Sequence, residues 1–184
     1  MRLFLAVELP GALRRALAEV QESLRRSEEG WRWVRPEGLH VTLRFLGEVA
    51  QERVPALSPL WRAAAAAAAE PEVEVGGLGT FPPRGRPRVL WVGLRDRSGG
   101  NLAALAAALE EAARGAGFTP EQRAFAPHLT LARAASGAAP RRPGTEVGTL
   151  GAFPAGELTL FRSVPGRGGA VYTALERYPL RPVN

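Results

Sequence analysis

Apolar and polar positions along the chain follow two different periods, which predicts a fold of mixed strands and helices. Short segments that are almost continuously apolar, or that alternate with a period of two, are typical of strands, whereas apolar residues every three to four positions are typical of helices. The strand-like segments are residues 2–9, 31–34, 39–46, 72–78, 88–94, 125–133, 156–163 and 170–178. The helix-like segments are residues 11–27, 52–70 and 100–116.

Proline and glycine separate these segments. Pro10 ends the first strand and suits the first position of a helix, because its fixed φ is already helical. Loops rich in proline, glycine and arginine are predicted at residues 80–87 and 135–144. No linker divides the chain, so we expect residues 1–184 to form one domain.

Size and composition limit the function classes that the chain can belong to. Its 184 residues, 46% of them apolar, are enough to bury a core. No apolar run approaches the roughly 18 residues that cross a bilayer, and the first residues lack a basic leader, so we expect a cytoplasmic protein without a membrane partner. The sequence has no cysteine, which excludes disulfides and thiolate nucleophiles. It also has no lysine, which excludes lysyl-adenylate and Schiff-base chemistry.

Arginine carries the whole of the basic charge. All 24 basic residues are arginine and the net charge is +6. The planar guanidinium fork fits phosphate oxygens, so this charge favours a polyanionic partner. A basic surface that serves solubility alone would give the same total.

The only two histidines occur in matching tetrads, HVTL within LHVTLRFL and HLTL within PHLTLARA. In each tetrad a threonine follows the histidine by two positions. With eight threonines in 184 residues, a threonine at a chosen offset is roughly a one-in-twenty event. A single strand histidine is more often a hydrogen-bonded structural residue than a catalyst. The repeat, which uses every histidine in the chain, favours a catalytic pair.

Strand geometry places the members of each tetrad. Side chains two positions apart point to the same face of a strand. His40 and Thr42 therefore share one face, and His128 and Thr130 share a face of the second strand. The intervening residues are predicted to face the core: Val41, Leu43 and Phe45 on the first strand, and Leu129 and Leu131 on the second.

Two imidazoles and two hydroxyls suit the hydrolysis of a phosphodiester. One histidine can take a proton from water while the other protonates the departing alkoxide. Threonine hydroxyls can donate to the nonbridging oxygens, where negative charge grows in the transition state. This scheme needs no cofactor and no metal, and no cluster with metal-ligand spacing is visible.

Three further residues are candidates for substrate binding. By strand parity Arg44 shares the His40 face, whereas Arg133 falls on the face opposite His128 unless the strand ends or bulges there. Phe81, Trp91 and Phe125 can each stack on a base, although core packing is the favoured role for all three. Of the three, Phe125 is the candidate for stacking.

The chain resembles the bacterial and archaeal RNA 2',3'-cyclic phosphodiesterase family, historically called 2'-5' RNA ligases, within the two-histidine phosphoesterase superfamily. The likeness runs through MRLFLAVELP, RWVRPEGLHVTLRFLGEV, GLGTFPP with PRVLWVGL, GFTPEQRAFAPHLTLAR, ELTLFRS and RYPL. The two histidine–threonine tetrads and their spacing are its specific part.

The resemblance implies a fold and a chemistry. The fold is α+β, with two lobes related by a pseudo-two-fold, each an antiparallel sheet with flanking helices, around a central cleft. His40 would donate a proton to the leaving ribose oxygen and His128 would accept one from water, with RNA ending in a 2',3'-cyclic phosphate as the substrate and a 2'-phosphate as the product. We expect the protein to be a monomer.

Two alternatives stay open on the sequence alone. The chain could be a noncatalytic RNA-binding module whose histidines are structural. It could also perform ATP-independent 2'-5' ligation of a cyclic phosphate end to a 5'-hydroxyl, which reverses the cleavage of a 2'-5' bond. Turnover of a short RNA with a cyclic phosphate end would separate these functions.

Overall fold

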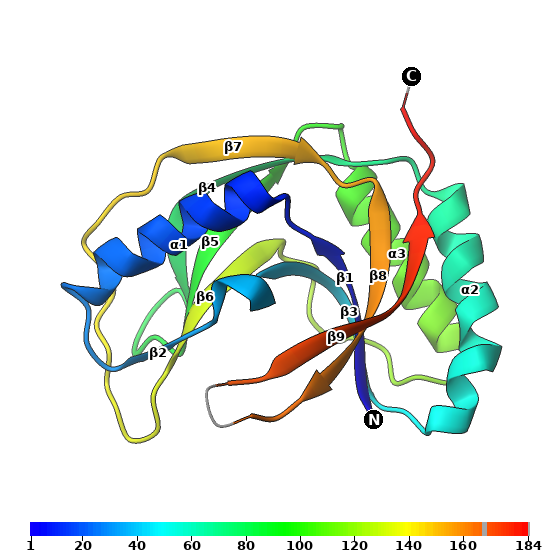
Figure 1. Ribbon diagram of the computed structural model, residues 1–184, viewed down its shortest axis with the longest axis horizontal. Coiled ribbons are helices and arrows are strands. Elements are labelled where there is room, and N and C mark those ends of the chain that lie inside the picture. Colours follow the sequence, from blue (N-terminus) through cyan, green and yellow to red (C-terminus); the bar gives the residue numbers. More distant parts are fainter. Residues whose placement is uncertain (167–168, 184) are drawn as a thin grey trace.

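The chain folds into strands and helices arranged around two sheets (Figure 1). The structure is a computed structural model and describes residues 1–166 and 169–183. In chain order the elements are β1 (Arg2–Glu8), α1 (Gly11–Arg25), β2 (Trp31–Trp33), η1 (Pro36–Gly38), β3 (His40–Glu48), η2 (Gln51–Arg53), α2 (Val54–Ala67), β4 (Glu72–Phe81), β5 (Val89–Asp96), α3 (Asn101–Gly115), β6 (His128–Ala134), β7 (Thr149–Pro154), β8 (Glu157–Val164) and β9 (Val171–Pro179).

The two sheets have matching strand orders. One runs β3-β1-β8-β9 and the other β2-β6-β5-β4-β7, and their neighbouring strands are antiparallel. In these orders β3 corresponds to β6, β1 to β5, β8 to β4 and β9 to β7, with β2 added at one edge. The predicted α+β fold of two related lobes is confirmed. Each histidine begins the strand that pairs with the central β1 or β5.

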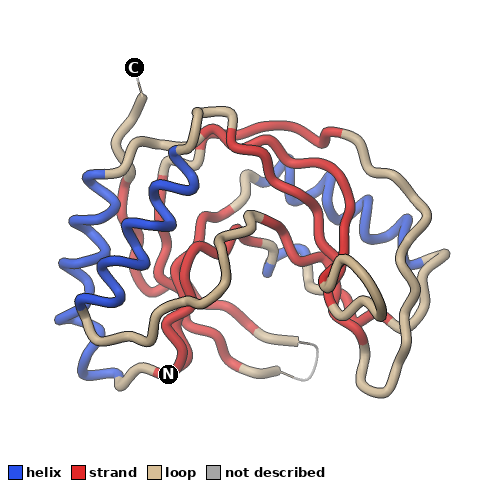
Figure 2. The backbone as a smooth tube through the Cα atoms, turned by 180° about the vertical axis from the view of Figure 1, so that it is seen from behind, coloured by secondary structure: helices blue, strands red, loops and turns tan. Residues whose placement is uncertain are grey.

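The helices that follow these central strands pack on the opposite lobes. α3 follows β5 but packs against β3 and α2, whereas α1 follows β1 but packs against β7 and η1 (Figures 1 and 2). Each lobe therefore contains a helix that follows a central strand of the other sheet. This exchange ties the two lobes together, because α1 and α3 each connect one sheet to the other.

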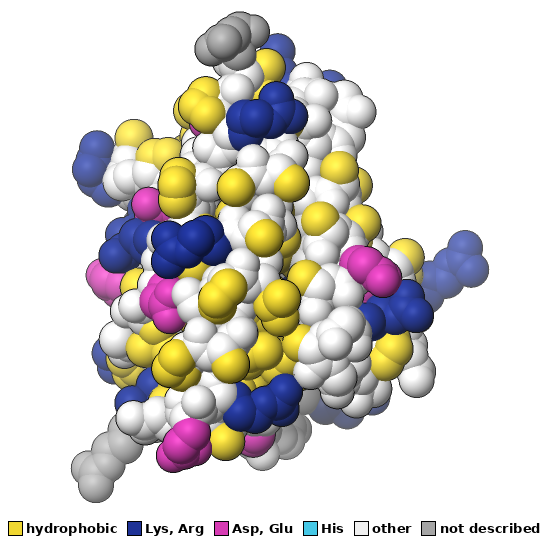
Figure 3. Space-filling view, turned by 90° about the vertical axis from the view of Figure 1, so that its right-hand side faces the viewer, with side chains coloured by type: hydrophobic (Ala, Val, Ile, Leu, Met, Phe, Trp, Pro, Cys, Tyr) yellow, Lys and Arg dark blue, Asp and Glu magenta, His cyan; other side chains and the backbone are white. Residues whose placement is uncertain are grey.

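The outer face of α2 and α3 carries small apolar side chains between scattered charges (Figure 3). In α2 they belong to the run Trp61–Ala67, where Trp61 and Ala65 are buried and most of the other alanines reach the surface. Alanine has the highest helix propensity, so this run forms a helix without needing a partner on its outer face. Among the described residues, no helix is both long and apolar enough to span a membrane.

Most of the predicted elements are present, and the main error is a missing strand. β7 was not predicted, because the sequence TLGAFP contains a glycine and ends in proline, which are breaking signals. It forms an edge strand that pairs only with β4 in the described part of the chain, a position that tolerates both residues. The strand predicted at 125–133 begins only at His128. That residues 1–184 form one domain stays a prediction.

Candidate active site

Both histidines are held in the same way at the start of their strands. The Nδ1 atom of His40 lies 2.7 Å from the carbonyl oxygen of Gly38, and the Nδ1 atom of His128 lies 2.7 Å from the carbonyl oxygen of Ala126. A carbonyl oxygen can only accept, so in each ring Nδ1 carries the hydrogen. In a neutral ring Nε2 is then the unprotonated nitrogen, the one able to exchange a proton with a substrate.

Each of the two strands contains a β-bulge at the same distance from its histidine. In β3 the pairing with β1 slips at Leu43, between Thr42 and Arg44. In β6 the pairing with β5 slips at Leu131, the residue after Thr130. A bulge inserts one unpaired residue, so every side chain beyond it points to the opposite face from the one that strict alternation predicts.

The bulge in β3 overturns two predictions. Arg44 pairs with Leu5 of the buried core, so the prediction that it shares the His40 face is wrong. Phe45 pairs with Phe4 and shares its face, so the prediction that Phe45 anchors the core is also wrong. The side chain of Phe45 is 48% exposed.

The equivalent bulge in β6 decides the position of Arg133. Strict alternation put Arg133 opposite His128 unless the strand bulged, and it does bulge. Arg133 pairs with Val89 and falls on the side of His128, which pairs with Gly93. Burial is the largest cause of the lowered pKa of His40, and the positive charge of Arg133 lowers that pKa further. Arg133 is therefore near both tetrads.

Gln21 supports the bulge in β6, and the sequence analysis missed it. The Gln21 side chain is 1% exposed, and its amide nitrogen donates to the carbonyl oxygens of Leu131, at 3.0 Å, and Val34, at 2.8 Å. The contact with Leu131 fixes the bulged residue of β6 to α1, and the same carbonyl oxygen also accepts from the backbone N–H of Val34 at 2.8 Å. A signal was present in the sequence, since Gln21 continues the buried stripe of α1 formed by Leu13, Leu17 and Leu24.

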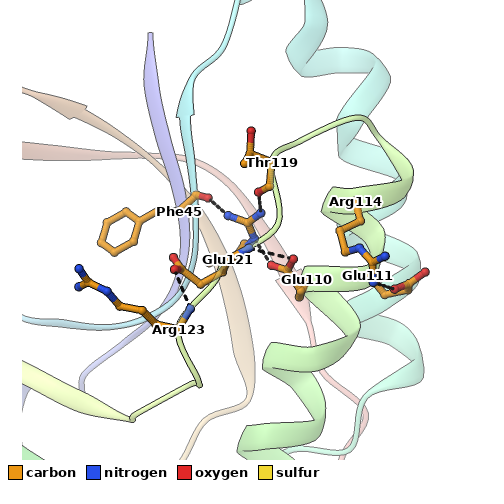
Figure 4. Close-up of polar contacts among 8 residues, drawn as sticks. Phe45, Glu110, Glu111, Arg114, Thr119, Glu121 and Arg123 are labelled. Atoms are coloured by element: carbon orange, nitrogen blue, oxygen red, sulfur yellow. Dashed lines mark hydrogen bonds and ion pairs between the residues drawn. The ribbon is translucent and has the colours of Figure 1, made fainter.

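Arg44 joins β3 to the segment that leads into β6 (Figure 4). Its Nε atom lies 2.5 Å from a carboxylate oxygen of Glu110 in α3, its NH2 group donates to the carbonyl oxygen of Thr119 at 2.6 Å, and its NH1 group donates to the carbonyl oxygen of Phe45. Glu110 also accepts from the backbone N–H of Glu121 at 3.1 Å. Each of the three nitrogens of Arg44 thus has a protein contact, which gives no support to the predicted substrate contact. Arg44 nevertheless borders the cavity that is described below.

His40 is surrounded by aromatic rings. Its ring centroid lies 4.7 Å from that of Phe4, 4.8 Å from that of Tyr172 and 5.9 Å from that of Phe161. Burial is the largest cause that lowers the pKa of His40 to about 4, and the charge of Arg133 lowers it further, against the opposing hydrogen bond to Gly38 and the charge of Glu8. In the free protein His40 is therefore neutral at pH 7.

His128 lies against a different pair of rings. Its ring centroid is 5.0 Å from that of Phe81, which meets it edge-on, and 6.4 Å from that of Trp91. Trp91 can occupy this place because Gly79 lies beside it on β4, where an added Cβ would come within 2.2 Å of the indole. Glycine at position 79 thus makes room for one wall of the His128 site.

A cavity of about 1040 Å³ opens beside Thr42 and His128. Among the predicted site residues, Thr42, Arg44, Phe125, His128 and Arg133 border it. His40 and Thr130 do not border it, but their strands β3 and β6 lie against each other. Phe125 both borders this cavity and packs on the core, so neither of its two predicted roles is excluded.

The described residues contain no group of three or more His, Cys, Asp or Glu side chains that could hold a metal ion. The two tetrads and Arg133 supply two imidazoles, two threonine hydroxyls and one guanidinium group. This set can exchange protons and hold an anion, which are the capacities that a phosphoesterase site requires.

Comparisons with known proteins agree with this class. The family described as LigT like Phosphoesterase matches residues 7–91 and then residues 92–172, so each half of the chain matches once. A Thermus thermophilus protein named RNA 2',3'-cyclic phosphodiesterase is 39% identical over 98% of this chain and 91% of its own length. The Escherichia coli protein of the same name is 36% identical over 97% of this chain and 96% of its own length.

Solved structures give the same result. A crystal structure from Thermus thermophilus has a TM-score of 0.84 at 35% identity, with 100% of both chains covered. E. coli LigT in complex with 3'-AMP has a TM-score of 0.77 at 31% identity, with 97% of both chains covered. The chain belongs to the LigT-like phosphoesterase family, as its tetrads indicated.

Proposed function

We propose that this phosphoesterase hydrolyses RNA 2',3'-cyclic phosphate ends to 2'-phosphates, with His40 as proton donor and His128 as proton acceptor. The observation that carries the proposal is the matched pair of imidazoles, each with Nδ1 held by the carbonyl oxygen two residues before it. The names of the Thermus thermophilus and E. coli relatives support the choice of substrate.

The reaction needs one proton to move at each histidine. Nε2 of His128 takes a proton from water as the water oxygen attacks phosphorus. The bond from phosphorus to O3' breaks, and O3' takes a proton from Nε2 of His40. The products are a 2'-phosphomonoester and a 3'-hydroxyl, so atoms and charge balance. Thr42 and Thr130 donate to the nonbridging oxygens, and Arg133 neutralises their charge.

The low pKa of His40 makes its donor role depend on the substrate. With a pKa of about 4, His40 carries no proton on Nε2 at pH 7 in the free protein. A bound cyclic phosphate brings a negative charge, which favours the protonated imidazole and also offsets the charge of Arg133. We therefore propose that His40 gains its proton as the substrate binds.

Product analysis tests the proposal. The purified protein is incubated with a short RNA that ends in a 2',3'-cyclic phosphate, and phosphorus NMR identifies the product. A 2'-phosphate supports the proposal, whereas a 3'-phosphate would reverse the orientation of the substrate and the two histidine roles. RNA that is bound but never turned over would indicate the noncatalytic module. Joining to an added 5'-hydroxyl strand would indicate ligation.

The same assay tests the proposed absence of a metal. We expect the rate to be unchanged in EDTA, because the proposed steps use only imidazole, hydroxyl and guanidinium groups. Loss of activity in EDTA that a divalent cation restores would refute the metal-free mechanism.

A further inference from the structure

Two arginines lie directly opposite each other on neighbouring strands of the five-stranded sheet. Arg32 in β2 pairs with Arg133 in β6, and both side chains are exposed. Directly opposed residues of an antiparallel pair share one face of the sheet, with their Cβ atoms roughly 5 Å apart. The strand register therefore holds two guanidinium groups side by side.

The neighbours of Arg32 in β2 show which face this is. Trp31 is buried in the core and Trp33 packs against it, with the guanidinium of Arg25 in α1 5.6 Å from the centroid of the Trp33 ring. Side chains alternate along a strand, so Arg32 points to the face away from α1. Arg133 shares that face and borders the active-site cavity, which Arg32 does not border. Arg32 thus lies one strand beyond Arg133, at the edge of the sheet.

This pair of arginines costs free energy unless an anion lies beside it. Like charges directly opposite each other on neighbouring strands are destabilising. The ion pairs formed within residues 1–166 and 169–183 all involve other side chains, so no carboxylate in this part of the chain offsets the repulsion. Phosphate oxygens can offset it, because the planar guanidinium fork fits their geometry. A phosphodiester is therefore the ligand class that suits the pair.

We propose that Arg32 binds the phosphate on the 5' side of the nucleotide that carries the cyclic phosphate. The inference rests on the proposed function, in which Arg133 neutralises the charge of the reacting phosphate. These two phosphates are attached to the same ribose, and Arg32 is one strand spacing, about 4.8 Å, from Arg133. The two guanidinium groups can therefore hold two successive phosphates. The site then recognises the end of an RNA chain more tightly than a single nucleoside.

The experiment compares two substrates that differ by this one phosphate. They are adenosine 2',3'-cyclic phosphate and its 5'-methylphosphate, which has the single negative charge of an RNA phosphodiester. The 5'-methylphosphate should have the lower KM in the wild type. We expect Arg32→Gln to raise that KM roughly 10-fold, the factor for losing one hydrogen bond to a charged group, with kcat within about twofold. KM for the substrate with a free 5'-hydroxyl should not change.

Arg15→Gln is the matched control, since Arg15 is also an exposed arginine but lies on α1 and does not border the cavity. It removes the same charge and should change neither KM. If Arg32→Gln raises KM equally for both substrates, or for neither, the inference is wrong, while the proposed hydrolysis stands. An equal rise in Arg15→Gln would also overturn it, because the effect would then be that of net charge. A thermal unfolding curve for each variant verifies that it is folded.

Equilibrium binding separates this inference from the proposed function. Adenosine 2',5'-bisphosphate and adenosine 2'-monophosphate are titrated into wild type and Arg32→Gln by calorimetry. Weaker binding of the bisphosphate alone to Arg32→Gln supports the inference even if the wild-type protein fails to hydrolyse a cyclic phosphate. Weaker binding of both ligands, or of neither, overturns it, whatever the hydrolysis assay shows.

Discussion

β3 and β6 carry the same local structure in different surroundings. Each begins with a histidine whose Nδ1 atom faces a carbonyl oxygen two residues earlier, and each bulges at the third residue after that histidine. His40 is enclosed by Phe4, Phe161 and Tyr172, and its pKa falls to about 4. His128 lies instead against Phe81 and Trp91. The same local structure thus stands in different surroundings in the two strands, and at His40 those surroundings lower the pKa of the imidazole, chiefly by burial.

The positions after the bulges extend the comparison. The fifth residue after the histidine borders the cavity in both strands, and it is Phe45 in β3 and Arg133 in β6. The fourth turns toward the core, and it is Arg44 in β3 and Ala132 in β6. The same backbone therefore offers an aromatic surface from one strand and a cation from the other.

Replacing either histidine should have the largest effect. His40→Ala and His128→Ala should each lower kcat by at least about 10²- to 10⁴-fold, the usual loss when a general acid or base is removed. Circular dichroism should show that both variants remain folded. Normal turnover by either folded variant would refute its role.

The leaving group then distinguishes the two histidines. A substrate with sulfur in place of O3' expels a thiolate, which needs no proton from an acid. It should restore most of the activity of His40→Ala and none of that of His128→Ala. Rescue of His128→Ala instead would exchange the donor and acceptor.

Arg44 should contribute more to the free energy of unfolding than Ala132, which occupies the equivalent place in β6 and has no charge to pair. Removing one partner of a largely buried ion pair leaves the other unpaired, so Arg44→Met should lower the free energy of unfolding by about 3 kcal/mol. Glu110→Gln in the Arg44→Met background should then have little further effect. Urea unfolding measures both. A loss below about 1 kcal/mol for Arg44→Met would show that the ion pair with Glu110 does not stabilise the fold.

Acid should destabilise the fold through His40. Its pKa in the folded protein, about 4, lies below the ordinary value of 6.5, so the unfolded chain takes up this proton first as the pH falls. Above pH 6.5 the neutral His40 makes its full contribution to the free energy of unfolding. This contribution is lost as the pH falls from 6.5 through 4, and the loss is about 3 kcal/mol at most. His40→Gln should lack this component, so the difference between the wild-type and variant curves of unfolding free energy isolates it. Parallel curves would show that burial does not lower the pKa of His40.

The sequence predicted the strand positions of the two histidines but not the packing around them. The two tetrads are local patterns, so the shared faces of His40 and Thr42 followed from strand alternation alone. The bulges depend on pairing with β1 and β5, and in β6 on Gln21 from a distant helix. A count along one strand cannot include those partners, and it therefore put Arg44 and Phe45 on the wrong faces.

The surroundings of His40 depend on contacts that are still more distant. Phe161 and Tyr172 come from β8 and β9, at the far end of the chain, and they complete the enclosure that lowers its pKa. Nothing in the local sequence LHVTLRFL indicates that aromatic rings from β8 and β9 enclose His40. The proton affinity of a histidine is a property of its packing, and the sequence gives that only once the strand order is known.

The threonines should give the smallest losses, and they locate the phosphate between the strands. Thr42→Ala and Thr130→Ala each remove one hydrogen bond to a charged oxygen, which corresponds to roughly a 10- to 150-fold fall in kcat, below the upper range for the loss of a proton transfer. Serine at either position keeps the hydroxyl and should retain most of the activity. Equal losses would place the phosphorus midway between β3 and β6, as the matched strands suggest. A larger loss at Thr42, which borders the cavity whereas Thr130 does not, would place the phosphorus nearer β3. A threonine variant as inactive as the histidine variants would mean that its hydroxyl takes part in the proton transfer itself.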